Sequence, residues 1–135
     1  MRQYITLILT TLLLNTAQAE TSDELKKDYA DFRKNYLAMI SNVPTKTDFI
    51  KNFSLLQSKL NKQFEAFQVK ERRQLTPEGN QMALDLEMLE PLHILAEAKI
   101  SPESCEFAFH NNELNSAADE SAAAKIEKHI SKLCK

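Results

Sequence analysis

Two cysteines, Cys105 and Cys134, are the side chains in this sequence best suited to covalent chemistry. Redox-active cysteines usually stand in a C-x-x-C motif, and these two do not. If the segments on either side of Ala118 fold back on each other as a helical hairpin, residues whose numbers sum to about 239 face each other, as these cysteines do. In an oxidising compartment such neighbours join. The sequence therefore predicts a structural disulfide.

The three histidines are the next candidates, because a pair of them can hold a metal ion. His110 and His129 also sum to 239. Each is five positions from a cysteine, a rotation of about 140° around a helix axis. If the cysteines face each other, the histidines turn to opposite sides of the hairpin. The only potential metal ligands at helical spacing from His93 are acidic residues. We therefore predict no metal site.

Two clusters of charged residues are candidate surfaces for binding a partner. The segment 45–73 holds 7 basic and 3 acidic residues, whereas 74–120 holds 1 basic and 10 acidic residues. The interpretation left open is that the two segments face each other inside the fold, where opposite charges attract. The candidate partner-binding residues are Lys70, Arg72 and Arg73 in the basic cluster and Asp85, Glu87 and Glu90 in the acidic cluster.

No motif of a known catalytic or cofactor site is present. The sequence lacks G-x-S-x-G, H-E-x-x-H and a glycine-rich phosphate loop, so we expect a protein that is not an enzyme. The position of His129 near the C-terminus resembles that of a haem ligand in exported four-helix cytochromes of the b562 type. That resemblance implies a methionine ligand early in the first helix, where "SDELKKDYADF" has none. We predict no cofactor.

The N-terminal segment predicts the compartment in which the protein works. Arg2 is followed by an apolar stretch from Ile5 to Leu14 and by Ala17-Gln18-Ala19, a pattern typical of a signal peptide cleaved before Glu20. The stretch is shorter than the roughly 20 apolar residues that a membrane span needs. We expect residues 1–19 to be removed, leaving a single domain, 20–135, that is periplasmic or secreted and has no membrane span.

Composition favours an all-α domain. The sequence has one glycine and no tryptophan, whereas β-sheet proteins need glycine in their turns. The predicted mature chain carries 16 basic and 19 acidic residues, a balance that argues against a nucleic-acid partner.

Apolar spacing predicts four to five helices. They extend from 21 to 43, from about 45 to about 73, from 76 to 96 with a bend at Pro91, from 101 to 115, and from 118 to 134. The sequences "TPE" and "SPE" mark two of the starts. The expected fold is a small helical bundle with a C-terminal hairpin clasped by the disulfide. The residues expected to face inward are Leu25, Tyr29, Phe32, Tyr36, Met39, Val43, Phe49, Phe53, Leu56, Leu60, Phe64, Phe67, Met82, Leu86, Leu89, Leu92, Ala96, Ala122, Ile126, Ile130 and Leu133.

By elimination, the sequence indicates an exported helical protein that acts by binding another macromolecule, as an immunity protein, an inhibitor or an envelope accessory protein does. The apolar face of the first helix is also compatible with a homodimer. The alternative is a carrier of a small apolar ligand or haem, with a pocket inside the bundle. That pocket would be lined by the aromatic and sulfur-containing side chains of the second and third helices, Phe49, Phe53, Phe64, Phe67, Met82 and Met88.

Overall fold

The protein folds as an all-α bundle. The computed structural model describes residues 23–42, 45–70 and 73–135. In these ranges the chain forms no strand, which confirms the predicted fold class. Its α-helices are a first helix (residues 23–41), α2 (Lys46–Gln68), α3 (Pro77–Met88), α4 (Glu90–Glu97), α5 (Pro102–Asn115) and α6 (Glu120–Leu133), with a 3-10 turn η1 (Arg73–Leu75) before α3. The predicted signal peptide lies outside the described residues.

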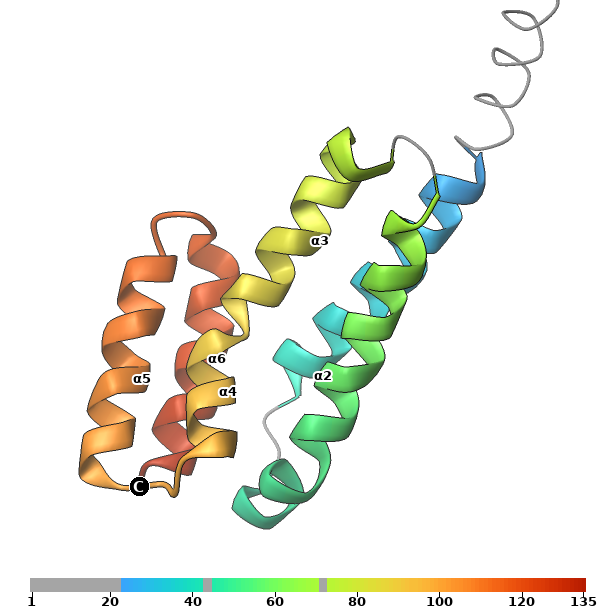
Figure 1. Cartoon of the computed structure of the whole chain (residues 1–135). Coiled ribbons are helices and arrows are strands. Elements are labelled where there is room, and N and C mark those ends of the chain that lie inside the picture. Colours follow the sequence, from blue (N-terminus) through green and yellow to red (C-terminus); the bar gives the residue numbers. More distant parts are fainter. Residues whose placement is uncertain (1–22, 43–44, 71–72) are drawn as a thin grey trace, which may run out of the picture.

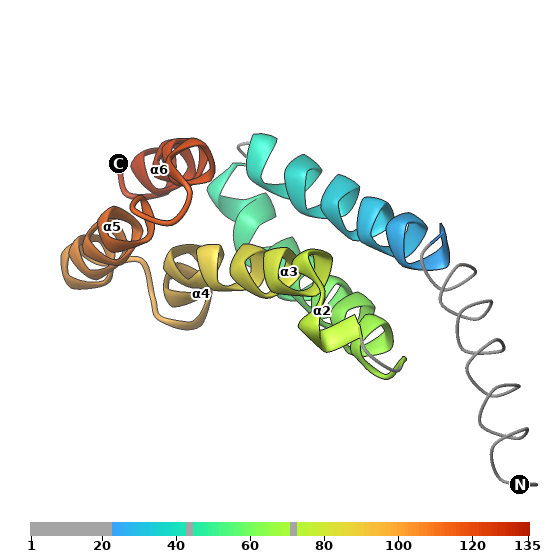
Figure 2. The ribbon, with the colours of Figure 1, turned by 90° about the horizontal axis from the view of Figure 1, so that it is seen from above.

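The helices form two groups joined by α3 and α4. The first helix and α2 lie side by side, and α5 and α6 form a hairpin on the other side of the molecule (Figure 1). The view from above shows α3 and α4 running between these groups (Figure 2). Because α4 packs against α2, α5 and α6, it connects the two groups through one core.

The core consists of the apolar faces that the helical spacing predicts, with two informative differences. Leu56 was expected inside but is 45% exposed. Ile40 was not among the expected core residues, yet it is buried at the end of the first helix. Val43 lies outside the described residues. Most of the other predicted core residues are buried, namely Leu25, Phe32, Tyr36, Phe49, Phe53, Leu60, Phe67, Met82, Leu89, Leu92, Ala122, Ile126, Ile130 and Leu133.

Side-chain caps fix the starts of the later helices. Thr45, Thr76, Ser101 and Asp119 each accept a hydrogen bond from the backbone N–H three residues later. These bonds satisfy N–H groups that have no partner within the helix. The "TPE" and "SPE" sequences therefore act as the predicted start signals.

Pro91 has a larger effect than the predicted bend, because the helix is interrupted at Leu89 and a second helix, α4, begins at Glu90. The proline has no N–H to bond the carbonyl oxygen of Glu87. That oxygen instead lies 3.5 Å from Nδ2 of Asn115 at the end of α5. The expected third helix is therefore two helices, α3 and α4, and the bundle has six helices in the parts of the chain that the structure describes.

The disulfide between Cys105 and Cys134 is present, as predicted, with the two Cα atoms 6.0 Å apart. It closes a loop between residues 29 positions apart, which should stabilise the fold by about 3–4 kcal/mol. The same hairpin is held further along by Asn112, whose Nδ2 donates to the carbonyl oxygen of Ala123 at 2.9 Å. α5 is therefore fixed against α6 at more than one level.

Candidate functional site

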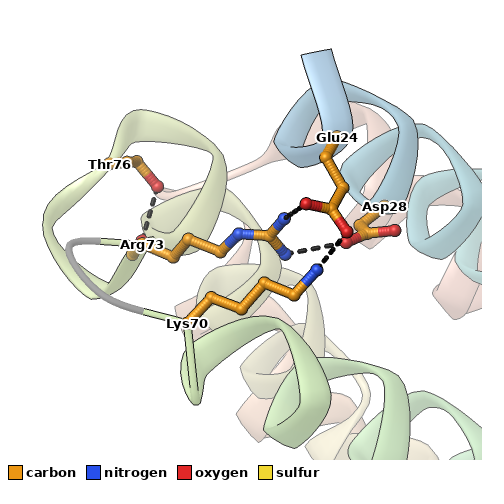
Figure 3. A network of polar contacts seen from close by, with 5 residues as sticks. All are labelled: Glu24, Asp28, Lys70, Arg73 and Thr76. Atoms are coloured by element: carbon orange, nitrogen blue, oxygen red, sulfur yellow. Dashed lines mark hydrogen bonds and ion pairs between the residues drawn. The ribbon is translucent and has the colours of Figure 1, made fainter. Parts of the chain in front are cut away.

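The basic cluster predicted for partner binding closes one end of the bundle. Arg73 is fully buried, and its Nη1 lies 2.7 Å from Oδ2 of Asp28 on the first helix (Figure 3). Its guanidinium also lies over the ring of Phe67, 4.8 Å from the centroid. Lys70 pairs with Glu24 on the same helix. We call these four charged residues, Glu24, Asp28, Lys70 and Arg73, the closed end.

The closed end also corrects the predicted end of the second helix. The sequence pattern predicts a helix to about Arg73, but α2 ends at Gln68. Arg73 itself begins the 3-10 turn η1. The Thr76 hydroxyl donates to the carbonyl oxygen of Arg73 at 2.5 Å. This turn directs the arginine towards Asp28. Arg72 lies outside the described residues.

The acidic cluster divides into one buried and two exposed residues. Asp85 is fully buried and accepts from Nη1 of Arg33 at 2.6 Å and from Nε2 of Gln81 at 2.9 Å. Burial raises the pKa of the Asp85 carboxyl, and the two bonds counteract part of that shift. Glu87 and Glu90 are exposed.

The two charged clusters do not pair with each other among the described residues. Both pair with the first helix, Arg73 with Asp28 and Asp85 with Arg33. Sequence reasoning considered only the net charge of two segments and left out the first helix, which carries charges of both signs. Of the six predicted partner-binding residues, Glu87 and Glu90 remain exposed candidates, and their role stays a prediction.

The histidines lie in three different environments. His110 is exposed on α5 and His129 is buried on α6. His93 contacts Gln57, with Nδ1 2.9 Å from Oε1. Within the described ranges, no group of three or more His, Cys, Asp or Glu side chains is arranged to hold a metal ion.

A pocket of about 280 Å³ opens at the other end of the first helix and α2. We call this the open end. The first helix and α2 form its walls, and one residue each from α4 and α6 closes its base. The lining residues are Asn35, Ala38, Met39, Asn42, Asp48, Phe49, Asn52, Phe53, Leu56, Lys59, Leu60, Leu92 and His129.

The sizes of the side chains explain why this end is hollow. Nearer the closed end the first helix buries Phe32 and Tyr36. At the open end the same helix presents Asn35, Ala38 and Met39, and none of these side chains carries a ring to fill the space in front of the rings on α2. Protein interiors otherwise pack with few voids. The pocket therefore follows from a change in residue size along a single helix.

His129 lies at the base of this pocket and is 2% exposed. Its Nε2 lies 2.9 Å from the carbonyl oxygen of Ile40, which can only accept, so Nε2 carries the proton. Burial lowers the pKa of His129, and the nearby Lys132 lowers it further. In this neutral ring Nδ1 is an acceptor. It is buried and has no hydrogen-bond partner among the residues that the structure describes.

A second surface lies on α5. Phe107 and Leu114 are 62% and 63% exposed, while Cys105 and Ala108 on the same helix are buried. The acidic residues Glu103, Glu106 and Glu113 are exposed beside them. We call Phe107 and Leu114 with these three acids the α5 ridge.

Sequence reasoning missed His129 and the α5 ridge as binding candidates, although both leave a signal. At 100° per residue, His129 lies about 20° from Ala122, an expected core residue of α6. Phe107 and Leu114 are seven residues apart, and both lie well away from Cys105 around the helix. The predicted disulfide turns Cys105 towards the last helix. Phe107 and Leu114 lie on the other side of the same helix, so they are expected to face outwards.

Comparison with known proteins gives no match for this chain. No protein-family model, curated protein or solved structure matches it. In the part of the chain that the structure describes, no helix is both long and apolar enough to cross a membrane.

Proposed function

We propose that this protein is exported and acts by binding another protein through the α5 ridge. The observation that carries the proposal is the exposure of Phe107 and Leu114 on a helix whose opposite side is already buried. Single exposed apolar residues are ordinary on protein surfaces. Two large ones on one side of a helix, fixed in place by a disulfide, form a preorganised contact.

The spacing of the two side chains suits a helix-binding partner. Seven residues are two helical turns, so Phe107 and Leu114 project from the same side about 10 Å apart. Residues at i and i+7 are typical anchors when one helix docks on another or in a groove.

The charges around the ridge define the partner's chemistry. Glu103, Glu106 and Glu113 are acidic, and Asn115 contacts the backbone of Glu87 at the end of α5. Glu87, one of the exposed acids predicted from sequence, therefore lies at the C-terminal end of α5, and Glu90 follows it three residues later in the chain. Such a surface favours a partner with basic residues around an apolar strip. An immunity protein, an inhibitor or an envelope accessory protein, the classes expected from the sequence, would act by binding of this kind.

Export is supported by two features. Residues 1–19 have the sequence pattern of a signal peptide. The Cys105–Cys134 disulfide suits an oxidising compartment, since such bonds are rare where thiols are kept reduced.

Affinity capture from the envelope fraction of the native host, under oxidising conditions, tests this function. The baits are the native protein, a ridge variant (Phe107→Ser with Leu114→Ser) and a control variant (Leu55→Ser with Val69→Ser). The control removes two apolar side chains of similar exposure from α2 and its end. We expect one dominant protein partner with the native bait and the control, and its loss with the ridge variant. Equal capture by all three baits would contradict the proposal.

A second candidate function, carriage of a small molecule, is favoured by the pocket at the open end. The pocket contains Phe49 and Phe53 from the aromatic face that the sequence analysis connected with a carrier. Concave, mainly apolar sites with a few polar groups are the usual form of ligand sites. Mass spectrometry of the natively folded protein after mild purification should detect a bound molecule.

A further inference from the structure

We propose that the open end binds a single-chain anionic amphiphile, such as a fatty acid of medium length, with its alkyl chain in the pocket and its carboxylate paired with Lys59 at the rim. This inference rests on the second candidate function, carriage of a small molecule. It adds the chemical class of the ligand and identifies the side chain that selects its charge.

The pocket is elongated along α2, which suits a chain. The residues of α2 that line it recur on successive turns, namely Asp48, Phe49, Asn52, Phe53, Leu56, Lys59 and Leu60. From the first to the last of them the helix rises about 18 Å. The volume of about 280 Å³ is roughly twice that of a cavity that holds one benzene molecule. Spread along such a length, this volume suits a flexible chain better than a compact ring system.

The interior of the pocket is apolar. Its most deeply buried apolar lining residues are Phe49, Phe53, Leu60 and Leu92. The two phenylalanine rings lie 5.0 Å apart between centroids. A charged group among these side chains would have no partner, which is strongly unfavourable. The buried part of the ligand is therefore apolar, and its charged group belongs at the exposed rim.

The rim offers a cation that the fold leaves available. Lys59 lines the pocket, is exposed and forms no ion pair with any residue that the structure describes. None of the positions three and four residues away on α2 is acidic, since they hold Leu55, Leu56, Lys62 and Gln63. The flexible lysine side chain ends in an ammonium group, which can meet a carboxylate over a range of positions at the rim.

Asp48, the acidic residue among the described lining residues, does not cancel this charge. It lies about 16 Å from Lys59 along the helix axis, beyond the roughly 8 Å over which exposed charges act at physiological salt. Asp48 also stands in the first turn of α2, where the positive end of the helix dipole stabilises a carboxylate. Between the two residues, Lys51 adds another exposed positive charge. The surroundings of Lys59 therefore favour an anion over a cation.

The first experiment compares two probes with the same chain and opposite head groups. Decanoate carries a carboxylate, and decyltrimethylammonium carries a quaternary ammonium group. Titration calorimetry of the native protein at neutral pH, with each probe below its micelle concentration, should give about fivefold tighter binding for decanoate, the effect of one exposed ion pair. Equal affinities, or tighter binding of the cation, would overturn the role of Lys59 and leave small-molecule carriage standing. No binding of either probe would overturn both.

Two pairs of variants locate the site, and all four positions are exposed, so the substitutions leave the core intact. Lys59→Gln should reduce the preference for decanoate to near one, whereas Lys62→Gln changes a lysine outside the lining and should keep it. Ala38→Phe fills the pocket from its wall and should weaken both probes at least tenfold. Ala30→Phe adds the same ring to the same helix outside the lining and should change neither. An unchanged preference in Lys59→Gln, or unchanged binding in Ala38→Phe, would contradict the proposal.

Discussion

The closed end and the open end are formed by the same two helices, yet one is filled by a buried ion pair and the other is hollow. At the closed end, Arg73 is buried and pairs with Asp28 on the first helix (Figure 3). At the open end, the first helix presents Ala38 to a pocket, and His129 keeps one ring nitrogen without a partner among the described residues. One end therefore uses its charges to hold the helices together. The other end retains space between the helices.

This difference teaches that charge alone does not identify a binding site. The basic cluster is the more conspicuous feature of the sequence, and at Lys70 and Arg73 it is used in internal ion pairs. The open end is conspicuous only once the helices are placed, because its features are a short side chain, Ala38, and a histidine from α6. A space that the side chains leave unfilled is the stronger sign of a binding site.

Among the substitutions that test this comparison of the two ends, we expect the largest loss of stability at Arg73. We expect Arg73→Ala to destabilise the fold by about 2–4 kcal/mol, because it removes a buried side chain that packs on Phe67 and pairs with Asp28. The value lies below that of a fully buried pair, since the Asp28 side chain is 39% exposed. Urea unfolding monitored by circular dichroism measures it.

Lys70→Ala is the matched control for Arg73→Ala. Both side chains of the Lys70–Glu24 pair are exposed, so we expect the free energy of unfolding to fall by less than about 1 kcal/mol. Equal losses in the two variants would show that the closed end is an ordinary solvated surface and would remove the distinction between the ends.

A smaller effect is expected at Gly79, which packs against the closed end. A Cβ atom there would lie 2.6 Å from the carbonyl oxygen of Arg73, a backbone atom that cannot move aside cheaply. Gly79→Ala should therefore destabilise by about 1–3 kcal/mol, although alanine is favoured in helices by about 1 kcal/mol. Asn80→Ala, at an exposed position of the same helix, should be neutral within about 0.5 kcal/mol. A stabilising Gly79→Ala would show that the turn at Arg73 is loosely packed.

The smallest effect is the pH dependence caused by His129 at the open end. Burial places its folded-state pKa below the unfolded value of about 6.5. Its contribution to stability is therefore complete above that value and is lost as the pH falls towards the folded pKa. Asp85 acts in the opposite direction, because its raised pKa favours the fold at low pH and loses that contribution as the pH rises.

Urea midpoints between pH 7.5 and 5.5 measure the contribution of His129. The native protein should lose stability across this range, and His129→Gln should lose less. His110→Gln changes an exposed histidine on α5 and should follow the native profile. Identical profiles for all three proteins would mean that His129 can become charged in place.

Much of the fold follows from local sequence patterns. Thr76 and Ser101 cap helices because "TPE" and "SPE" are local signals, and the Cys105–Cys134 pairing follows from the symmetry of a hairpin. The burial of Arg73 could not be predicted in this way. It depends on Asp28, 45 positions earlier, and a basic cluster at the end of a helix is normally solvated.

The candidate site was less predictable for the same reason. The spacing of the apolar residues predicts that Leu56 lies inside, but the structure places it on the pocket wall. The side chains of the first helix that line the pocket there, Asn35, Ala38 and Met39, carry no ring. The contact of His129 with Ile40 joins residues 89 positions apart. A pocket is the space left between helices, and no single segment of sequence encodes it.

The most direct test of the difference between the two ends is a titration of the uniformly 15N-labelled native protein with decanoate, followed by amide chemical shifts. We predict that the largest changes occur at the open end, at residues 38–42 at the end of the first helix, at Phe49 and Phe53 of α2, and at His129 of α6. The amides of Asp28 and Arg73 at the closed end should not move. Changes centred on the closed end or on the α5 ridge, or no saturable change at all, would contradict the assignment of the open end as a binding site.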